Sequence, residues 1–292
     1  AEKDNKTPLQ LADTPNLDAL TKNATYGPVQ TIPDNLQPGN EISCMGLMGL
    51  DPNKYASSPA LLSAAGLGLT PAPDEIALCC DFITLQPTHD DMVMKDYTGG
   101  QLSHEDSSLL LRALQEQVVD TPVTFHHGGG YHNLMFMKTA PISEPLSAPN
   151  ELIGEGIRQF MPESETAREL VFVMNQAQII LHNHPYNKQH VAEQKDPVNS
   201  IWLWGNGSLD DLPSFQSRYD KTASLITASL MAKGIGKLTG MDVVNVEGAT
   251  GFSDTSYSAK VSATLKELET KDVVFLHISA GEEVSLKGSL DD

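Results

Sequence analysis

The segment Val273-Val274-Phe275-Leu276-His277-Ile278 is an almost continuous apolar run, and two similar runs precede it at residues 224–227 and 243–246. Helical patterns separate these runs, one ending near residue 236 and one covering about residues 255–268. Strands that are apolar on both sides and alternate with helices are typical of a parallel sheet with helices on both faces. We expect an earlier apolar run at residues 201–204 to belong to this α/β unit as well.

The middle of the chain has a different pattern and predicts a second α/β module. Strand-like runs occupy residues 76–85, 92–95 and 131–137, and helical patterns follow Ser103 and cover about residues 163–182. The segment Thr70-Pro71-Ala72-Pro73 precedes this part and is typical of a linker. The prediction is therefore a core built from residues 1–72 and 197–292, with an inserted α/β domain at residues 73–196.

Charge restricts the partners that the chain can attract. The formal net charge is -19, from 38 acidic and 19 basic residues, so the overall field repels nucleic-acid backbones and anionic membrane surfaces. We expect no nucleic-acid partner. A phosphate ester would be repelled as well, unless local Lys, Arg or metal charge attracts it.

The three cysteines, Cys44 and the adjacent Cys79 and Cys80, do not have the spacing of a metal site. Their odd number also argues against a disulfide framework. They predict buried thiols in a reducing, intracellular compartment. No apolar run reaches the roughly 18 residues of a membrane span, and the first residues do not resemble a signal peptide.

A series of short motifs occurs in one order along nearly the whole chain: Lys6-Thr7-Pro8-Leu9, Ala12-Asp13-Thr14-Pro15-Asn16-Leu17-Asp18, Gly49-Leu50-Asp51-Pro52-Asn53-Lys54-Tyr55, Asp96-Tyr97 with Gly100, Pro197-Val198-Asn199-Ser200-Ile201-Trp202-Leu203-Trp204-Gly205, Pro213-Ser214-Phe215, Lys233-Gly234-Ile235-Gly236 and Gly248-Ala249-Thr250-Gly251. This series resembles the archaeal-type cofactor-independent phosphoglycerate mutases, members of the alkaline phosphatase superfamily. The resemblance implies an alkaline-phosphatase-like parallel sheet covered by helices, here incomplete at both chain ends, with an inserted second α/β domain.

The resemblance places Asn40 where the family has the serine that takes up and returns phosphate with the help of two divalent metals. An amide can hydrogen-bond a phosphate but cannot carry it. Ser43 lies three residues further on, and a displacement of several Å would destroy the in-line geometry of an attack from there.

The resemblance also places non-ligating residues at metal-ligand positions. The family's aspartate and histidine, four residues apart, correspond to Glu282 and Leu286, and a further family aspartate corresponds to Leu230. An alkyl side chain cannot coordinate a cation. We therefore expect no cofactor in this chain, whereas an active family member would hold two divalent metals such as Mn, Mg or Zn.

Substrate-binding charge is reduced in the same way. Family runs with arginine read Cys79-Cys80-Asp81 and Tyr131-His132-Asn133 here, so two guanidinium groups suited to phosphate are replaced. Lys233 remains as a candidate that could meet a phosphate, as could the amide of Asn40. The run His126-His127-Gly128-Gly129-Gly130 predicts a turn rather than a phosphate loop, because no Lys-Ser/Thr follows it.

These replacements predict a catalytically inactive phosphoglycerate-mutase-like protein, a pseudoenzyme that serves as a structural or accessory subunit of a larger protein assembly. The first alternative is a metal-dependent, cofactor-independent phosphoglycerate mutase, an isomerase that interconverts 3- and 2-phosphoglycerate. The second is a sensor that binds a phosphorylated metabolite through Asn40 and Lys233. We expect other protein subunits as partners under the first reading, and a small phosphate ester under the alternatives.

Overall fold

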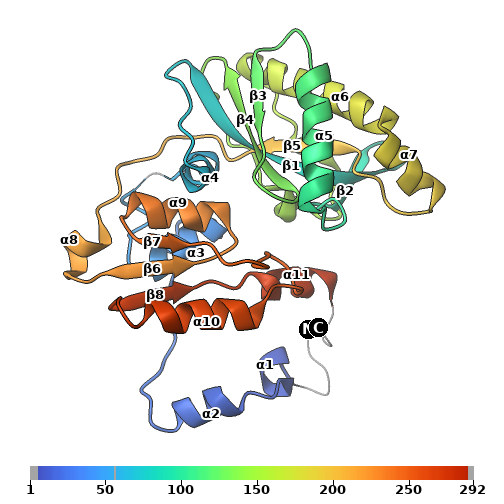
Figure 1. Ribbon diagram of the computed structural model, residues 1–292. Helices are drawn as coiled ribbons and strands as arrows, with labels where there is room; N and C mark the ends of the chain where they lie inside the picture. Colours follow the sequence, from blue (N-terminus) through green and yellow to red (C-terminus); the bar gives the residue numbers. More distant parts are fainter. Residues whose placement is uncertain (1–5, 56, 289–292) are drawn as a thin grey trace.

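The computed structural model describes residues 6–55 and 57–288, and within α11 the side chains of Glu282, Leu286 and Lys287 lie outside this description. The chain forms two halves, each built around its own sheet (Figure 1). The strands are β1 (Glu75–Pro87), β2 (Met92–Asp96), β3 (Val123–His126), β4 (His132–Lys138), β5 (Ser200–Trp204), β6 (Ala223–Ile226), β7 (Asp242–Val244) and β8 (Val273–Leu276). The α-helices are α1 (Pro8–Leu11), α2 (Pro15–Thr21), α3 (Asn40–Leu47), α4 (Pro59–Leu67), α5 (His104–Gln117), α6 (Arg168–Asn183), α7 (Pro185–Ala192), α8 (Phe215–Tyr219), α9 (Leu230–Leu238), α10 (Tyr257–Glu267) and α11 (Ala280–Lys287). Short 3-10 helices cover Pro149–Leu152, Ile157–Phe160 and Glu165–Ala167.

The five-stranded half contains β1 to β5 with α5, α6 and α7. Its strands run in the order β2-β1-β4-β3, with β5 paired to β1, and all of these pairings are antiparallel. Residues 77–85 of β1 are buried without interruption, because the sheet is covered on both faces. Ser63 of α4 contacts His132 on one face, and Ser107 of α5 contacts the next residue, Asn133, on the other.

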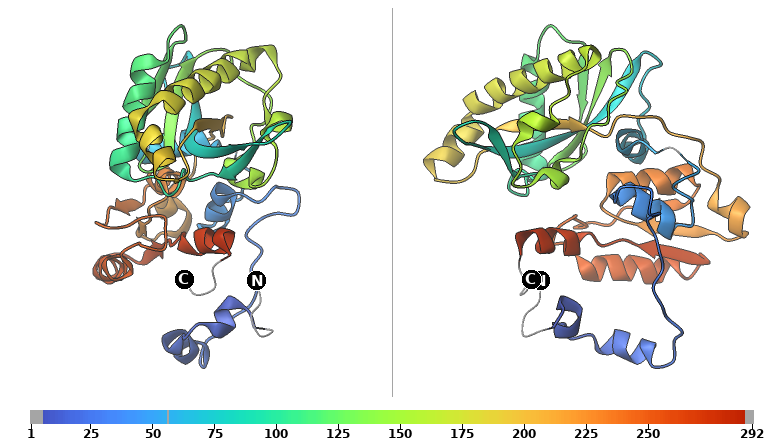
Figure 2. Two further views of the ribbon diagram at one scale, coloured as in Figure 1. Left: turned by 90° about the vertical axis from the view of Figure 1, so that its right-hand side faces the viewer. Right: turned by 180° about the vertical axis from the view of Figure 1, so that it is seen from behind.

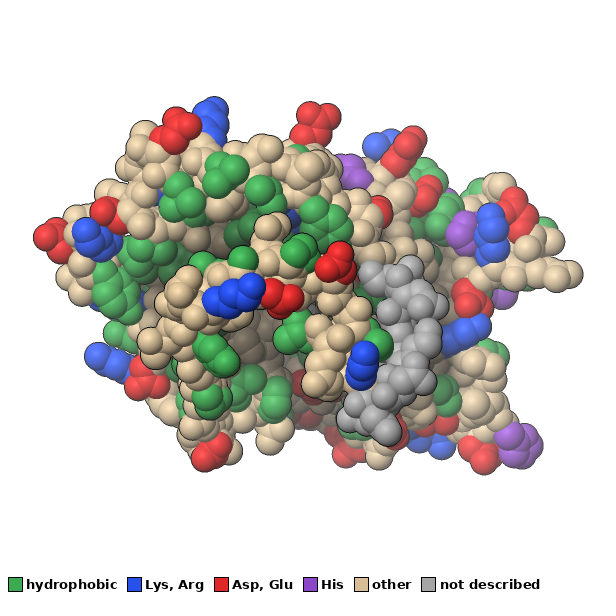
Figure 3. All heavy atoms as spheres, turned by 90° about the horizontal axis from the view of Figure 1, so that it is seen from below, with side chains coloured by type: hydrophobic (Ala, Val, Ile, Leu, Met, Phe, Trp, Pro, Cys, Tyr) green, Lys and Arg blue, Asp and Glu red, His purple; other side chains and the backbone are tan. Residues whose placement is uncertain are grey.

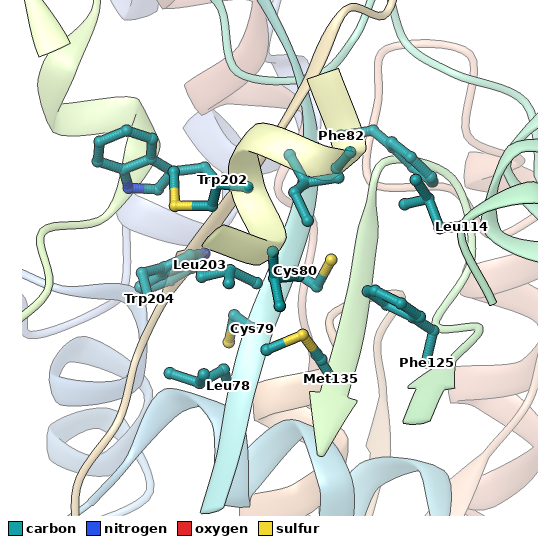
Figure 4. Packing of buried hydrophobic residues seen from close by; sticks show 14 of the residues in the cluster. Leu78, Cys79, Cys80, Phe82, Leu114, Phe125, Met135, Trp202, Leu203 and Trp204 are labelled. Carbon is teal, nitrogen blue, oxygen red and sulfur yellow. The ribbon is translucent and has the colours of Figure 1, made fainter. Parts of the chain in front are cut away.

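Figure 4 shows how apolar side chains from several elements surround β1 in the larger core of the molecule. Cys80 and Phe82 of β1 are fully buried there, together with Met135 of β4 and Leu114 of α5. Helix α5 is fixed locally by its sequence: the hydroxyl of Ser103 accepts a hydrogen bond from the backbone N–H of Asp106 at 3.1 Å, as an N-cap does. The capped helix predicted after Ser103 is confirmed.

The three-stranded half contains the parallel sheet β7-β6-β8. Helix α9 lies on one side of this sheet and α10 on the other (Figures 1 and 2). The predicted parallel unit with helices on both faces is confirmed for the runs that form β6, β7 and β8.

The prediction for residues 201–204 is wrong in one respect. This run forms β5, which pairs antiparallel with β1 in the other sheet. All five residues of β5 are buried, so the continuous apolar run marks burial on both faces but does not identify the neighbouring strand. The sheet of the predicted inserted domain therefore extends beyond residue 196, to Trp204.

Helices α4 and α9 join the two halves at a close crossing. A Cβ atom added to Gly66 would clash with the backbone carbonyl of Leu230, and one added to Gly234 would clash with the carbonyl of Leu62. Only glycine at these two positions lets the helix backbones approach so closely. Helix α4 also contributes Ala60 to the larger core and Leu62 to the core of the three-stranded half.

Residues 6–30 form an arm that carries α1 and α2 below α10, at a distance from the rest of the ribbon (Figures 1 and 2). Apart from Thr14, the residues of this arm are exposed, including Leu17 and Leu20. Figure 3 shows hydrophobic side chains exposed on this lower face. Residues 29–32, which read as a short strand in the sequence because Val29 and Ile32 are apolar, do not form a strand.

Among the described helices, none has both the length and the apolar character needed to cross a membrane.

Candidate functional site

A pocket of about 690 Å³ lies between the two halves. Its walls come from both: Tyr97 and His132 belong to the five-stranded half, and Thr250 and His277 belong to the three-stranded half. His277 directly follows β8, so the pocket includes the carboxyl end of the parallel sheet, where ligands bind in open α/β sheets.

Four helices begin at this pocket. The residues that line it include the first residue of α3 (Asn40), of α5 (His104) and of α9 (Leu230), and the residue before α11 (Ser279). The free backbone N–H groups and the helix dipole make the start of a helix favourable for a negative charge. These helix starts therefore contribute partial positive charge to a pocket that Asp81, Asp254 and Glu283 also line.

Lys233, one turn into α9, also lines the pocket. Its Nζ donates a hydrogen bond to the side-chain oxygen of Asn245 at 3.2 Å. Burial, together with the charge of Lys237, lowers the pKa of Lys233. A bound anion would relieve both effects, since it favours the protonated amine.

Asn40 lies in the pocket, as the resemblance implies, and follows the N-cap Gly39 at the start of α3. Ser43 is less well placed, because its hydroxyl donates to the carbonyl oxygen of Gly39 at 3.0 Å within its own helix. Asn40, Lys233 and Leu230 are thus brought together at one site. Leu230 is buried there, and its side chain has no atom that could bind a metal ion.

The positions predicted at Glu282 and Leu286 belong to α11, but their side chains lie outside the described residues. The neighbouring Glu283 is buried and lines the pocket. Its carboxylate accepts a hydrogen bond from the backbone N–H of Ser253 at 3.0 Å and another from the side-chain amide of Gln101 in the five-stranded half.

The described residues do not fit a dinuclear metal site. No group of three or more His, Cys, Asp or Glu side chains among them is placed to hold a metal ion. The donors that do line the pocket have other contacts; for example, Asp254 accepts from the hydroxyl of Thr250 at 2.5 Å.

Asp81, which is buried, and His132, which is partly buried, form a pair at the pocket wall. They are opposite each other on β1 and β4, and Nδ1 of His132 lies 2.5 Å from the Asp81 carboxylate. The indole N–H of Trp204 donates to the other carboxylate oxygen at 2.8 Å, and Nε2 of His132 lies 3.2 Å from the hydroxyl of Ser63. Burial opposes the charge on His132, but the adjacent Asp81 more than offsets it, so that the pKa of His132 is raised.

Sequence reasoning treated positions 79–81 and 131–133 only as lost arginine and missed this pair. The signal was weak, because the two residues are 51 positions apart and only the strand register brings them together. Ser63 is fully buried, so this Ser-His-Asp arrangement has no accessible nucleophile. It acts as a polar network that fixes α4 to the five-stranded sheet.

Two other predictions can be compared with the structure. The histidine-glycine run forms the end of β3 and the turn that follows it, as expected, and His127 packs edge-on against His104 with ring centroids 4.2 Å apart. Cys44, Cys79 and Cys80 are free and buried, and burial raises the pKa of each thiol, which makes a reactive thiolate unfavourable.

Comparison with known proteins gives one consistent family. A family model described as 2,3-bisphosphoglycerate-independent phosphoglycerate mutase matches residues 21–187. A probable 2,3-bisphosphoglycerate-independent phosphoglycerate mutase of Geobacter sulfurreducens is 35% identical over 286 residues, which is 98% of this chain and 72% of the relative. The enzyme of that name from Methanosarcina barkeri is 35% identical over 287 residues, 98% of this chain and 71% of the relative.

A solved protein from Pyrococcus horikoshii has a similar fold, with a TM-score of 0.66 and 22% sequence identity over 95% of this chain and 66% of that chain. The sequence matches extend through both halves of the molecule and include the helices that begin at the pocket. The chain belongs to the 2,3-bisphosphoglycerate-independent phosphoglycerate mutase family.

Proposed function

We propose that the pocket binds a phosphorylated three-carbon acid of the phosphoglycerate class. The observation that carries this proposal is the convergence of four helix N-termini and Lys233 on one pocket. The names of the relatives support the same class of ligand.

The local field of the pocket has to overcome the net charge of -19. A helix N-terminus stabilises a nearby anion by about 0.3–1 kcal/mol, and by more when the geometry is partly buried. Four such termini and one lysine together offset the repulsion from Asp254 and Glu283, both of which already accept hydrogen bonds from the protein. The phosphate group is expected near Asn40 and Lys233, where an amide N–H and an amine can donate to its oxygens.

Binding without phosphoryl transfer through residue 40 is the form of this function that the geometry supports best. The amide of Asn40 cannot form a phosphoryl ester, and the hydroxyl of Ser43 is bonded within its helix. This form of the proposal corresponds to the second alternative drawn from the sequence, a sensor that binds a phosphorylated metabolite through Asn40 and Lys233.

Phosphoglycerate mutase activity is a second candidate, and the comparisons favour it. The relatives named as mutases match 98% of this chain at 35% identity. Turnover would require an oxygen nucleophile other than residue 40, so this candidate makes a clear prediction of its own: a phosphorylated side chain in a chain that converts 3-phosphoglycerate to 2-phosphoglycerate.

The role as an accessory subunit of a larger assembly stays a prediction. Exposed apolar residues on one face of α10, including Tyr257, Val261 and Leu265, are consistent with a protein partner. Native mass spectrometry of the protein isolated from its source addresses this point directly, since the mass of a single chain would contradict it.

Calorimetry with 3-phosphoglycerate tests the proposed function, with glycerate as the ligand that lacks phosphate. We expect heat from the phosphorylated acid only, and a loss of affinity of about tenfold in Lys233→Met, because a charge-assisted hydrogen bond is removed. Lys188→Met, exposed in α7, is the matched control and should bind like the wild type.

Phosphorus NMR of the same mixtures, with and without Mn²⁺, measures turnover. Binding without conversion supports the proposal, and conversion of 3-phosphoglycerate would replace it with the mutase candidate. Absence of binding to the wild-type chain in both conditions would refute a phosphoglycerate site.

A further inference from the structure

Lys260 in α10 is a fully buried lysine that has no acidic partner among the described residues. Its relative exposure is 0%, and its Nζ has only two long hydrogen bonds, to the backbone carbonyl oxygens of Thr250 at 3.4 Å and of His277 at 3.5 Å. In the described part of the chain, no carboxylate lies within ion-pair distance of this amine. Buried amines are normally paired, because a charge that has lost its hydration is costly.

The amine lies directly behind the pocket. Thr250 and His277, whose carbonyl oxygens it contacts, both line the pocket. Thr250 belongs to the loop between β7 and α10, and His277 follows β8. Lys260 therefore links two segments at the carboxyl end of the parallel sheet, and a single layer of residues separates it from the pocket.

The ionisable groups on the surrounding elements already have partners of their own. Nδ1 of His277 lies 2.8 Å from the hydroxyl of Thr227, Asp254 accepts from Thr250, and Glu283 accepts from Ser253. On α10 itself, Glu267 accepts from Ser224. Burial alone accounts for the lowered pKa of Lys260, which agrees with an amine that no charged neighbour balances.

We propose that Lys260 is the charge-balancing residue of this pocket: a bound anion holds its amine in the protonated form, so that binding of a phosphorylated acid takes up a proton. This inference rests on the proposed function and adds proton linkage to it. The balance is simple, because one proton moves from solvent to Nζ and no bond to the ligand forms. Lys260 is a positioning residue, since it acts through the field across the pocket wall and through the two carbonyl groups that it connects.

The physical reason is the asymmetry between the empty and the occupied pocket. In the protein without a ligand, removal of the amine from water favours its neutral form. The two carbonyl oxygens offset only part of the cost of burying the protonated form. A phosphate in the pocket adds negative charge on the other side of Thr250 and His277. Electrostatic interactions across the protein interior are stronger than in bulk water. The amine is therefore protonated in the complex over a pH range in which it is partly neutral in the free protein.

Calorimetry in two buffers of equal pH and different ionisation enthalpy measures the linked protons, with 3-phosphoglycerate as the ligand and neither buffer containing phosphate. Because burial lowers the pKa of Lys260, we expect a net proton uptake on binding at pH values below the ordinary lysine pKa of about 10.4. In Lys260→Met, which keeps nearly the length of the side chain and removes the amine, this uptake should fall to the part that belongs to Lys233, and the affinity should fall about tenfold.

Two further variants make the result specific. Lys266→Met carries the same change at an exposed site on the same helix and should keep both the affinity and the uptake. Lys233→Met should lose affinity but retain the part of the uptake that belongs to Lys260. Circular dichroism and thermal unfolding of each variant show that the fold is intact, and no loss of stability is expected for Lys260→Met, since an unpaired buried charge is removed.

The outcomes separate the two proposals. If the wild type binds 3-phosphoglycerate and Lys260→Met binds it with the same affinity and the same uptake, the role of Lys260 is refuted and the proposed function stands. If the wild type binds with no net uptake at any pH, the linkage is also refuted. If the wild type gives no binding heat, the proposed function fails, and the charge-balancing role fails with it.

Discussion

Strand β1 of the five-stranded half has nine consecutive buried residues, whereas all four residues of β8 in the three-stranded half are only partly buried. The larger core surrounds β1 and receives side chains from both faces of its sheet. The three-stranded half contributes most of the helix starts at the pocket: those of α3, α9 and α11. The central strand β6 of the three-stranded half is fully buried, so the difference lies in the size of the cores and in the edge strand β8. The pocket therefore takes one wall from the half with the larger core and most of its helix starts from the half with the smaller one.

Phe82→Ala should be the most damaging change and tests the core of the five-stranded half. Phe82 is fully buried in β1, and loss of a buried phenylalanine costs about 3–5 kcal/mol of unfolding free energy through lost burial and a cavity. Phe275→Ala in β8 is the matched change in the other half and should cost about 1–2 kcal/mol, because Phe275 is only partly buried.

Urea unfolding followed by circular dichroism, which reports on the helices and strands of both halves, measures both variants, and tryptophan fluorescence adds a probe of one half. The two tryptophans of the chain, Trp202 and Trp204, both lie in β5, so this signal reports on the five-stranded half. Equal costs at the two positions would contradict the proposed difference between the halves.

His132→Gln should cost about 3 kcal/mol at low pH, since it leaves the buried Asp81 carboxylate without its cationic partner. Because the pKa of His132 is raised in the folded protein, the stabilisation by its charge is complete below the unfolded value of about 6.5 and is lost as pH rises through the folded pKa. The difference in unfolding free energy between wild type and variant should therefore be larger at about pH 6 than at about pH 9. A difference that grows with pH would contradict the ion pair.

Gly234→Ala addresses the crossing of α4 and α9 that joins the halves. The added methyl group would clash with the carbonyl oxygen of Leu62, so the helices must move apart, at a cost of about 1–3 kcal/mol. Gly27→Ala is the control, because an added Cβ there meets nothing within 4 Å. Thermal unfolding is the measurement, and unchanged stability in Gly234→Ala would show that the crossing tolerates separation.

Leu20→Ser in the arm should have the smallest effect, less than about 0.5 kcal/mol, because this side chain is 67% exposed and contributes little to a core. Hydrogen exchange at residues 7–30 should be fast in both proteins. Slow exchange of this segment, or a large loss of stability in Leu20→Ser, would mean that the arm is packed in solution.

The elements of the fold could be predicted largely from local patterns. The alternation of apolar runs and helices predicted the parallel strands β6, β7 and β8, and Ser103 marked the start of α5. The partner of β5 could not be predicted, because a run such as residues 201–204 shows only that both faces are buried. Strand pairing depends on contacts between residues far apart in the sequence.

The site was predictable only where a motif named a residue. Asn40, Leu230 and Lys233 were found by resemblance, and the structure brings all three into one pocket. The convergence of helix starts and the burial of Lys260 leave no local signal, since each helix start is ordinary by itself and Lys260 occupies a position in an amphipathic helix where solvent exposure is expected. Both are products of tertiary packing.

The contact of α4 with α9 through Gly66 and Gly234 has a mechanical consequence. Two helices whose backbones touch can pivot about their crossing but cannot slide or separate without breaking van der Waals contact. The crossing is therefore the natural fulcrum for any relative rotation of the halves, and the travel must be greatest at the opposite rim, where Gln101 reaches across to Glu283. Opening of the pocket for ligand entry would then break the contact of Gln101 with Glu283 and the ring contact of Tyr131 with Phe252, while the glycine crossing holds the two halves together.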